Sequence, residues 1–168
     1  MSTAEARFEL RAVTSDDQAF LRALYSDVRG EEFAAARIPA AALESLLNTQ
    51  FEAQRRHYES QYPGAEHLLI LVDAAPAGRL WMHWSDEGLR VIDVSLMSRH
   101  RGRGIGTALL QSLQAQATAR GAPIRLAVTR TNRAARLYAR LGFNESGGDA
   151  VYRQLRWSPV AQGLKTAS

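Results

Sequence analysis

SLMSRHRGRGIGT, residues 95–107, joins a predicted strand to a predicted helix and decides the fold. Its three glycines stand at alternate positions, so the backbone can approach an anion without Cβ atoms in the way. The free N–H groups of the helical turn that follows would point at that anion, and the helix dipole adds a favourable field. Arg101 and Arg103 supply full charges and paired donors that suit phosphate oxygens. The stretch therefore predicts a turn that binds a pyrophosphate.

Two better-known glycine motifs do not fit this turn. A dinucleotide fingerprint requires G-x-G-x-x-G, whereas Gly102, Gly104 and Gly106 are spaced G-x-G-x-G. A Walker A loop ends in G-K-[ST], and Gly106-Thr107 lacks the lysine. A simpler alternative stays open, in which the glycines only end a strand and start a helix.

The rest of the chain predicts an alternation of strands and helices, with one crossover. Ser15 and Gln18 form a predicted capping box at the start of the first helix. The crossover runs from the strand at 89–97 through the helix after Gly104 to the strand at 124–128, which makes the two strands parallel neighbours with ligands at their carboxyl ends. The predicted strands are 8–13, 67–72, 78–84, 89–97, 124–128 and one or two between 143 and 157, and the predicted helices are about 15–28, 39–62, 105–121 and 132–141.

Length and composition limit the classes of protein. The chain has 168 residues, 46% of them hydrophobic, and no cysteine, which indicates one soluble domain, 1–158, followed by a flexible tail, 159–168. The absence of cysteine excludes a disulfide scaffold, a Cys-ligated zinc site and a thiol nucleophile. No apolar run has the length of a membrane span or a signal peptide, so we expect a cytoplasmic protein with no membrane partner.

The charges are distributed unevenly along the chain. Residues 1–98 hold nine Arg and fifteen acids, whereas residues 99–168 hold eleven Arg, one Lys and two acids. A second half this basic suggests a polyanionic partner, which net charge alone does not identify. Because the basic half begins at the glycine-rich turn, we interpret it as a field for one phosphorylated cofactor.

Two blocks of sequence resemble a known family. Arg101-Gly102-Arg103-Gly104-Ile105-Gly106 resembles the R/Q-x-x-G-x-G/A signature of the GNAT superfamily of acetyl-CoA-dependent N-acetyltransferases. About 26 residues downstream, the segment from Asn132 to Phe143 resembles the family's N-x-x-A...L-Y-x-x-x-G-F block. The resemblance implies an α/β (α+β) fold: a mixed, mostly antiparallel sheet of six to seven strands, flanked by four helices, with one parallel pair splayed at the cofactor site.

The resemblance also implies which residues bind acetyl-CoA. Main-chain groups at the end of the strand would hold the pantetheine arm, and the turn would hold the pyrophosphate. Asn132 would bond to the cofactor arm, and Tyr138 would protonate the departing thiolate. The implied cofactor-binding residues are Leu96, Met97, Ser98, Arg101, Gly102, Arg103, Gly104, Ile105, Gly106, Thr107, Asn132 and Tyr138.

Two of these assignments have structural alternatives. Asn132 is also a good N-cap for the short helix that follows it. Tyr138 also fits an aromatic core position, on the helix face that it shares with Ala135 and Leu141.

Acetyl transfer to an amine requires a neutral amine, an oxyanion stabiliser and a protonated leaving group. Without cysteine there is no cysteinyl intermediate, so we expect direct attack in a ternary complex. Backbone N–H groups near Leu96 and Met97 would stabilise the oxyanion. Strand alternation makes Asp93 the first candidate for the base and His83 the second, although Asp93 also fits an ordinary polar position on a half-exposed strand.

The resemblance implies that acceptor recognition belongs to the more variable part of the family, which is the first two helices and the loops before the second strand. That part is acidic and would suit a cationic small-molecule or protein amine, unless its acids only form a solvated helix face. Other hypotheses are a catalytically silent CoA-binding module and a basic nucleic-acid-binding domain. We expect no nucleic-acid partner and no metal, and edge strands near the carboxyl terminus allow a homodimer. The acids are Asp27, Glu31, Glu32, Glu44, Glu52 and Glu59.

Overall fold

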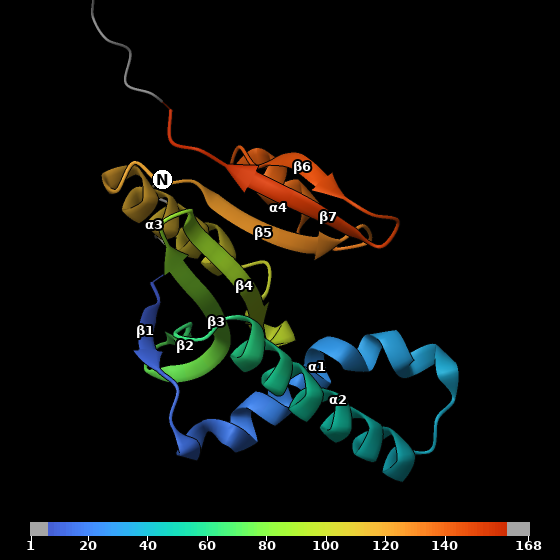
Figure 1. Cartoon of the computed structure of the whole chain (residues 1–168). Helices are drawn as coiled ribbons and strands as arrows, with labels where there is room; N and C mark the ends of the chain where they lie inside the picture. Colours follow the sequence, from blue (N-terminus) through green and yellow to red (C-terminus); the bar gives the residue numbers. More distant parts are fainter. Residues whose placement is uncertain (1–6, 161–168) are drawn as a thin grey trace, which may run out of the picture. The chain divides into compact units, whose positions relative to one another are not determined.

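A computed structural model describes residues 7–160 of the chain (Figure 1). The described part contains seven strands and four α-helices in the predicted order, with a second strand after the last helix. In chain order the elements are β1 (Glu9–Ala12), α1 (Gln18–Phe33), α2 (Ala40–Gln61), β2 (Glu66–Val72), β3 (Ala75–Ser85), β4 (Gly88–Leu96), α3 (Ile105–Ala119), β5 (Ile124–Thr129), α4 (Ala135–Arg140), β6 (Asn144–Gly148) and β7 (Tyr152–Trp157).

The strands form one mixed sheet in the order β1-β2-β3-β4-β5-β7-β6. Only β4 and β5 are parallel, and the other described neighbours are antiparallel. This arrangement confirms the crossover predicted through the helix after Gly104. It also confirms the predicted α+β class with a mostly antiparallel sheet.

The described chain separates into two compact units. The first contains the chain up to His83 together with residues 91–109, and the second contains residues 84–90 and the chain from Leu110 onward. Strand β4 contributes Gly88–Arg90 to the second unit and its remaining residues to the first. The single domain at 1–158 stays a prediction, and residues 161–168 of the predicted tail lie outside the described part.

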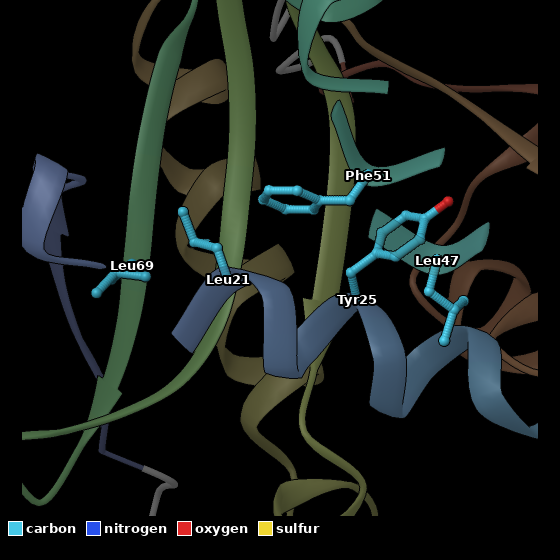
Figure 2. Packing of buried hydrophobic residues seen from close by; sticks show 5 residues of the cluster. All are labelled: Leu21, Tyr25, Leu47, Phe51 and Leu69. Carbon is cyan, nitrogen blue, oxygen red and sulfur yellow. The ribbon is translucent and has the colours of Figure 1, made fainter. Parts of the chain in front are cut away.

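The core of the first unit lies where α1 and α2 pack on the sheet. Figure 2 shows its buried members, which are Leu21 and Tyr25 of α1, Leu47 and Phe51 of α2, and Leu69 of β2. The Tyr25 and Phe51 rings pack edge to face with centroids 5.7 Å apart. Leu21 and Tyr25 are four residues apart, as are Leu47 and Phe51, so each pair occupies one face of its helix. The two helices predicted from sequence thus contribute one face each to this core.

Helix α2 follows strand β3 with matched spacing. Gln54 of α2 bonds to Arg79 of β3, and Tyr58 packs edge to face on Trp81 at 5.1 Å. One helical turn further on, the ring of Tyr62 lies 6.4 Å from that of His83. Four residues of a helix rise about 6 Å, and two residues of a strand rise about 6.7 Å. Every fourth residue of α2 therefore meets every second residue of β3. Helix α2 therefore covers the β3 face that carries Arg79.

The second unit has a core of alternating strand residues and one helix face. The buried residues of β5 are every second one, as expected for a strand with one covered face. Gln114 of α3 donates its side-chain N–H to the carbonyl of Leu141, just after α4, at 2.7 Å. The buried residues of this unit include Leu110, Leu113, Ala117, Ile124, Leu126, Val128, Phe143 and Leu155.

The start of the first helix differs from the sequence prediction. The capping box is formed by Thr14 and Asp17, one residue earlier than the predicted Ser15 and Gln18. The Asp17 carboxylate accepts the Thr14 N–H at 2.7 Å and both terminal nitrogens of Arg11 at 2.8 Å. Arg11 lies on β1, so a tertiary ion pair selects this box over its neighbour.

Strand β3 begins earlier than the predicted Gly78. Asp73 and Ala74 form a tight turn with φ values of 50° and 63°, and Ala75 already pairs with Val72. The sequence has no glycine at this turn, although such turns favour one, and Pro76 argues against a strand. The sequence therefore did not indicate that β3 begins at Ala75. At Gly78, a Cβ would collide with the Ser95 carbonyl oxygen, which makes glycine necessary for the close approach of β3 to the end of β4.

Candidate active site

The turn between β4 and α3 has the backbone that the glycine-rich stretch predicted. After β4 ends at Leu96, a one-turn 3-10 helix covers Ser98–His100 and α3 begins at Ile105. Gly102 and Gly104 have φ values of 71° and 81°, in the left-handed region that other residues rarely adopt. Gly106 lies within the first turn of α3. Two of the three glycines are therefore required by the path of the chain itself.

The start of α3 presents donors to an anion. The first backbone bond of the helix runs from the Ala108 N–H to the Gly104 carbonyl at 3.0 Å. The N–H groups of Ile105 and Gly106 precede that bond and have no carbonyl acceptor within the helix. Helix N-termini of this kind favour negative charge because the dipole and the N–H groups act together.

The side chains of the turn create a positive environment. Partial burial and the charges of Arg99 and Arg103 lower the pKa of His100 below its usual value. The Nε–H of Arg99 donates to His100 Nε2 at 3.3 Å, which requires that nitrogen to be unprotonated. A neutral histidine beside arginines is the expected response to a positive potential. The turn is therefore suited in both backbone and charge to a phosphorylated ligand.

Three main-chain groups predicted to meet the cofactor already have partners within the chain. The Leu96 carbonyl accepts the Arg101 Nε–H at 3.1 Å, and the Ser98 N–H donates to Asp27 at 2.7 Å. The Met97 N–H donates to the Ala77 carbonyl of β3 at 2.8 Å. In this conformation the Met97 and Ser98 N–H groups are therefore not available to a ligand, whereas the Leu96 carbonyl can accept a second hydrogen bond.

Asp93 lies in a buried network on the face of the sheet covered by α2. Its Oδ2 accepts the Arg79 Nε–H at 2.7 Å and the Ser95 hydroxyl at 3.0 Å. Arg79 is only 4% exposed and also donates to Gln54 Oε1 at 2.6 Å, while the Asp93 side chain is 21% exposed. One carboxylate oxygen is thus committed to the network, and no partner of Oδ1 is found among the described residues. Its role as a base stays a prediction.

His83, the second candidate for the base, lies in the same unit. Its Nδ1 is buried and has no hydrogen-bond partner among the described residues. Arg79, Trp81 and His83 alternate along β3, and the Arg79–Asp93 pair shows that this series faces the same side of the sheet as Asp93. The strand alternation predicted from sequence is therefore correct for both candidate bases.

Asn132 is not the N-cap of α4 that the sequence left open, because that position is Ala134. The side-chain Oδ1 of Asn132 accepts the N–H of Ala134 at 2.7 Å, in an Asx turn just before α4. Helix α4 begins at Ala135, so the predicted helix at 132–141 is too long at both ends. A bond from Asn132 to the cofactor arm stays a prediction.

Tyr138 is a buried residue of α4. Its side chain is 8% exposed, and its ring packs edge to face on Phe143 with centroids 5.7 Å apart. The Phe143 N–H donates to the Tyr138 carbonyl at 3.0 Å, so the chain that follows α4 turns back toward Tyr138. This packing agrees with the core alternative, while the role as an acid stays a prediction.

The predicted site residues fall in both compact units. The first unit contains Asp93 and the strand–turn–helix from Leu96 to Thr107, and the second contains Asn132 and Tyr138. Sequence reasoning assigned Asp27 to a cationic acceptor and missed its bond to Ser98. It also missed Gln54, which bonds to Arg79, the partner of Asp93. No local pattern marks these contacts, because each partner lies far away in the sequence.

Most of the acids on the first two helices are already paired. Glu52 lies 2.7 Å from Arg22 and 2.8 Å from Arg55, and Arg55 also pairs with Glu59. Glu32 pairs with Arg29, and Asp27 with Ser98 and Arg101. These pairs weaken the expectation of a free acidic surface for a cationic acceptor and favour the solvated helix face.

Residues 7–160 contain no candidate for a metal site or a membrane span. No group of three or more His, Asp or Glu residues there could hold a metal ion. Among the helices in the described part, none is long and apolar enough to cross a membrane.

Comparisons with known proteins identify the family. Residues 32–143 match the model of the acetyltransferase (GNAT) family, which is well over half of the chain. The protein therefore belongs to the GNAT family of acetyltransferases. No curated protein matched the sequence.

Solved structures show the same fold at low sequence identity. The chain is similar to PaiA N-acetyltransferase from Thermoplasma acidophilum, crystallised with coenzyme A, at 16% identity and a TM-score of 0.69, over 91% of this chain and 99% of that one. The chain is also similar to an acetyltransferase from Thermus thermophilus, at 19% identity and a TM-score of 0.67, over 92% of this chain and 99% of that one. A third similar structure is the ribosomal-protein-S18-alanine N-acetyltransferase from Escherichia coli. It has 17% identity and a TM-score of 0.60, over 96% of this chain and 99% of that one.

Proposed function

We propose that this GNAT protein transfers an acetyl group from acetyl-CoA to a primary amine by direct attack in a ternary complex. The observation that carries the proposal is the turn between β4 and α3, where left-handed glycines, a helix N-terminus and three arginines favour a pyrophosphate. The match of residues 32–143 to the acetyltransferase family supports acetyl-CoA, a thioester, as the donor of the acetyl group.

The residues of the turn have distinct roles in this proposal. The N–H groups from Gly102 to Thr107 bond to the pyrophosphate, while Arg101 and Arg103 balance its charge. The main chain of Leu96, Met97 and Ser98 follows the pantetheine arm, with Asn132 as a further contact. A carbonyl oxygen accepts two hydrogen bonds, so the arm can bond to the Leu96 and Ser98 carbonyls while Arg101 stays on Leu96 and the Ser98 N–H stays on Asp27.

The chemical step needs a base for the acceptor and an acid for the leaving group. An ammonium group with a pKa near 10 is only about one part in 10³ neutral at pH 7, so a base contributes substantially. Asp93 accepts the proton through Oδ1, directly or through water, because Oδ2 is held by Arg79 and Ser95. Tyr138 protonates the thiolate as the C–S bond breaks.

The acceptor is a primary amine on a small molecule or a protein. The pairing of most acids on α1 and α2 argues against selection by a bare negative surface. Recognition therefore depends on the shape and polarity of the site more than on net charge.

Isothermal titration with CoA, followed by a free-thiol assay over a panel of amines, tests the proposal. We expect CoA to bind and at least one amine to release thiol from acetyl-CoA. Tyr138→Phe should lower turnover while leaving the Kd for CoA within about twofold. Failure to bind CoA at 1 mM, a concentration about a thousandfold above a micromolar Kd, would exclude the proposal.

A second candidate is a CoA-binding module without catalysis. The commitment of Asp93 Oδ2 to a buried arginine favours it, because the carboxylate then has a structural role that requires no catalysis. Tight CoA binding without thiol release for any amine in the panel would select this candidate.

A further inference from the structure

Asp27, an acid of α1, is bonded to the first residue of the 3-10 turn after β4. The Ser98 N–H donates to Asp27 Oδ2 at 2.7 Å, and the Ser98 hydroxyl donates to Oδ1 at 2.9 Å. Both carboxylate oxygens are used, and the two residues are 71 positions apart in the sequence. Only tertiary structure brings them together, since α1 and the turn have no local sequence relation.

The same carboxylate also faces Arg101. Arg101 Nη2 lies 3.7 Å from Asp27 Oδ2, and the Arg101 Nε–H donates to the Leu96 carbonyl at 3.1 Å. The planar guanidinium is therefore held on two sides, by the last carbonyl of β4 and by the charge of Asp27. The side chains of Asp27 and Arg101 are 26% and 31% exposed, so water screens this pair only in part.

The 3-10 turn depends on this contact more than a longer helix would. Ser98–His100 is a single turn, and its N-cap residue, Met97, supplies no side-chain acceptor. Asp27 supplies the missing acceptor from a different element, in the way that an N-cap carboxylate does within one helix. The path of the chain from Ser98 to Gly104 therefore starts from a point fixed by α1.

We infer that Asp27 is a positioning residue for acetyl-CoA. It holds the turn in the shape in which Arg101 and the N–H groups after it meet the pyrophosphate. The inference rests on the proposed function, because it concerns the same cofactor site. Asp27 acts through Ser98 and Arg101 and touches no reacting atom. It also connects α1, on which the family's acceptor region lies, to the cofactor turn.

Calorimetry with CoA as the ligand tests the inference. Asp27→Ala is expected to raise the Kd for CoA about tenfold, which corresponds to about 1.4 kcal/mol. The KM for acetyl-CoA should rise in proportion while kcat stays within about twofold, because the reacting groups are unchanged. Ser98→Ala loses the hydroxyl bond but keeps the N–H bond, so it should show a smaller rise.

Two control variants separate positioning from general effects. Asp16→Asn removes an exposed acid next to α1 and should leave the Kd unchanged, which controls for net charge. Asp17→Ala breaks the ion pair with Arg11 in the same unit but away from the turn. It should lower stability without changing the Kd, which controls for destabilisation.

Hydrogen exchange gives a readout that does not depend on the ligand. In Asp27→Ala the amide of Ser98 should lose protection, and the amides of His100 and Arg101, which bond to the Met97 and Ser98 carbonyls, should follow. Asp17→Ala should leave all three unchanged.

The outcomes distinguish this inference from the proposed function. If wild-type protein binds CoA and Asp27→Ala binds it equally well, the inference is overturned and the proposed function stands. Tighter binding by Asp27→Ala would also overturn it, because Asp27 would then compete with the ligand for Ser98 and Arg101. If the wild type does not bind CoA, the proposed function itself fails.

Discussion

Replacing Asp93 with alanine would leave a buried arginine without its counter-ion. Arg79 is 4% exposed and has two partners, Asp93 at 2.7 Å and Gln54 at 2.6 Å. Removing one partner of a buried pair typically costs about 3–5 kcal/mol. The Asp93 side chain is 21% exposed and Gln54 remains in place, so water and the amide compensate in part. We expect a loss of about 2–3 kcal/mol in the free energy of unfolding.

Urea unfolding at pH 7 measures this loss directly. In a thermal melt of a chain of this size, each kcal/mol lowers the melting temperature by about 2–4 °C, so the melting temperature of Asp93→Ala should fall by about 4–12 °C. Glu87→Ala is the matched control, since Glu87 pairs with Arg125 at 3.1 Å but its side chain is 78% exposed. That exposed pair should contribute less than about 1 kcal/mol.

A loss below about 0.5 kcal/mol for Asp93→Ala would refute the argument, because Arg79 would then be satisfied without its carboxylate. The result also bears on catalysis. Asp93→Asn keeps an oxygen acceptor in place but cannot serve as a base. If Asp93 is the base, this variant should lose turnover and keep its affinity for CoA.

Three further predictions follow from other contacts. Asp17→Ala removes the acceptor of Arg11 and Thr14 and should cost about 2–3 kcal/mol in urea unfolding; a cost equal to that of an exposed acid would contradict it. Gly104→Ala places a Cβ on a residue with a φ of 81° and should cost about 1–2 kcal/mol, measured in the same way, and no cost would mean that the turn has another path. Burial first, and then the charge of Arg79, lowers the pKa of His67 from 6.5 to about 4. Because the unfolded chain takes up this proton first, stability should decrease as the pH falls from 6.5 to 4, by about 1–2 kcal/mol after allowance for partial exposure. In His67→Phe, which keeps a ring to stack on Trp81, that contribution should be absent, and an unchanged slope of stability against pH would assign it to other groups.

The local sequence determined the elements and the turn. Helical spacing in the first two helices, strand alternation along β3, and the glycines at 102 and 104 each act over a few residues, so their consequences follow from the pattern alone. The crossover to β5 followed as well, because a strand–helix–strand unit has one favoured handedness and few alternatives. These patterns predicted the elements and the crossover, while the blocks at 101–106 and 132–143 carried the family resemblance and the description of the sheet that it implies.

Tertiary structure alone decided which polar groups are committed. The sequence marked Asp27, Glu52 and Asp93 as acids, but only the folded chain brings them to Ser98, Arg22 and Arg79. It likewise moved the capping box to Asp17, because Arg11 of β1 lies beside it. Charge and hydrogen-bonding capacity are properties of a residue type, whereas their satisfaction depends on partners far away in the chain. The sequence therefore names the residue types that are available to a site, but it does not give their network of contacts.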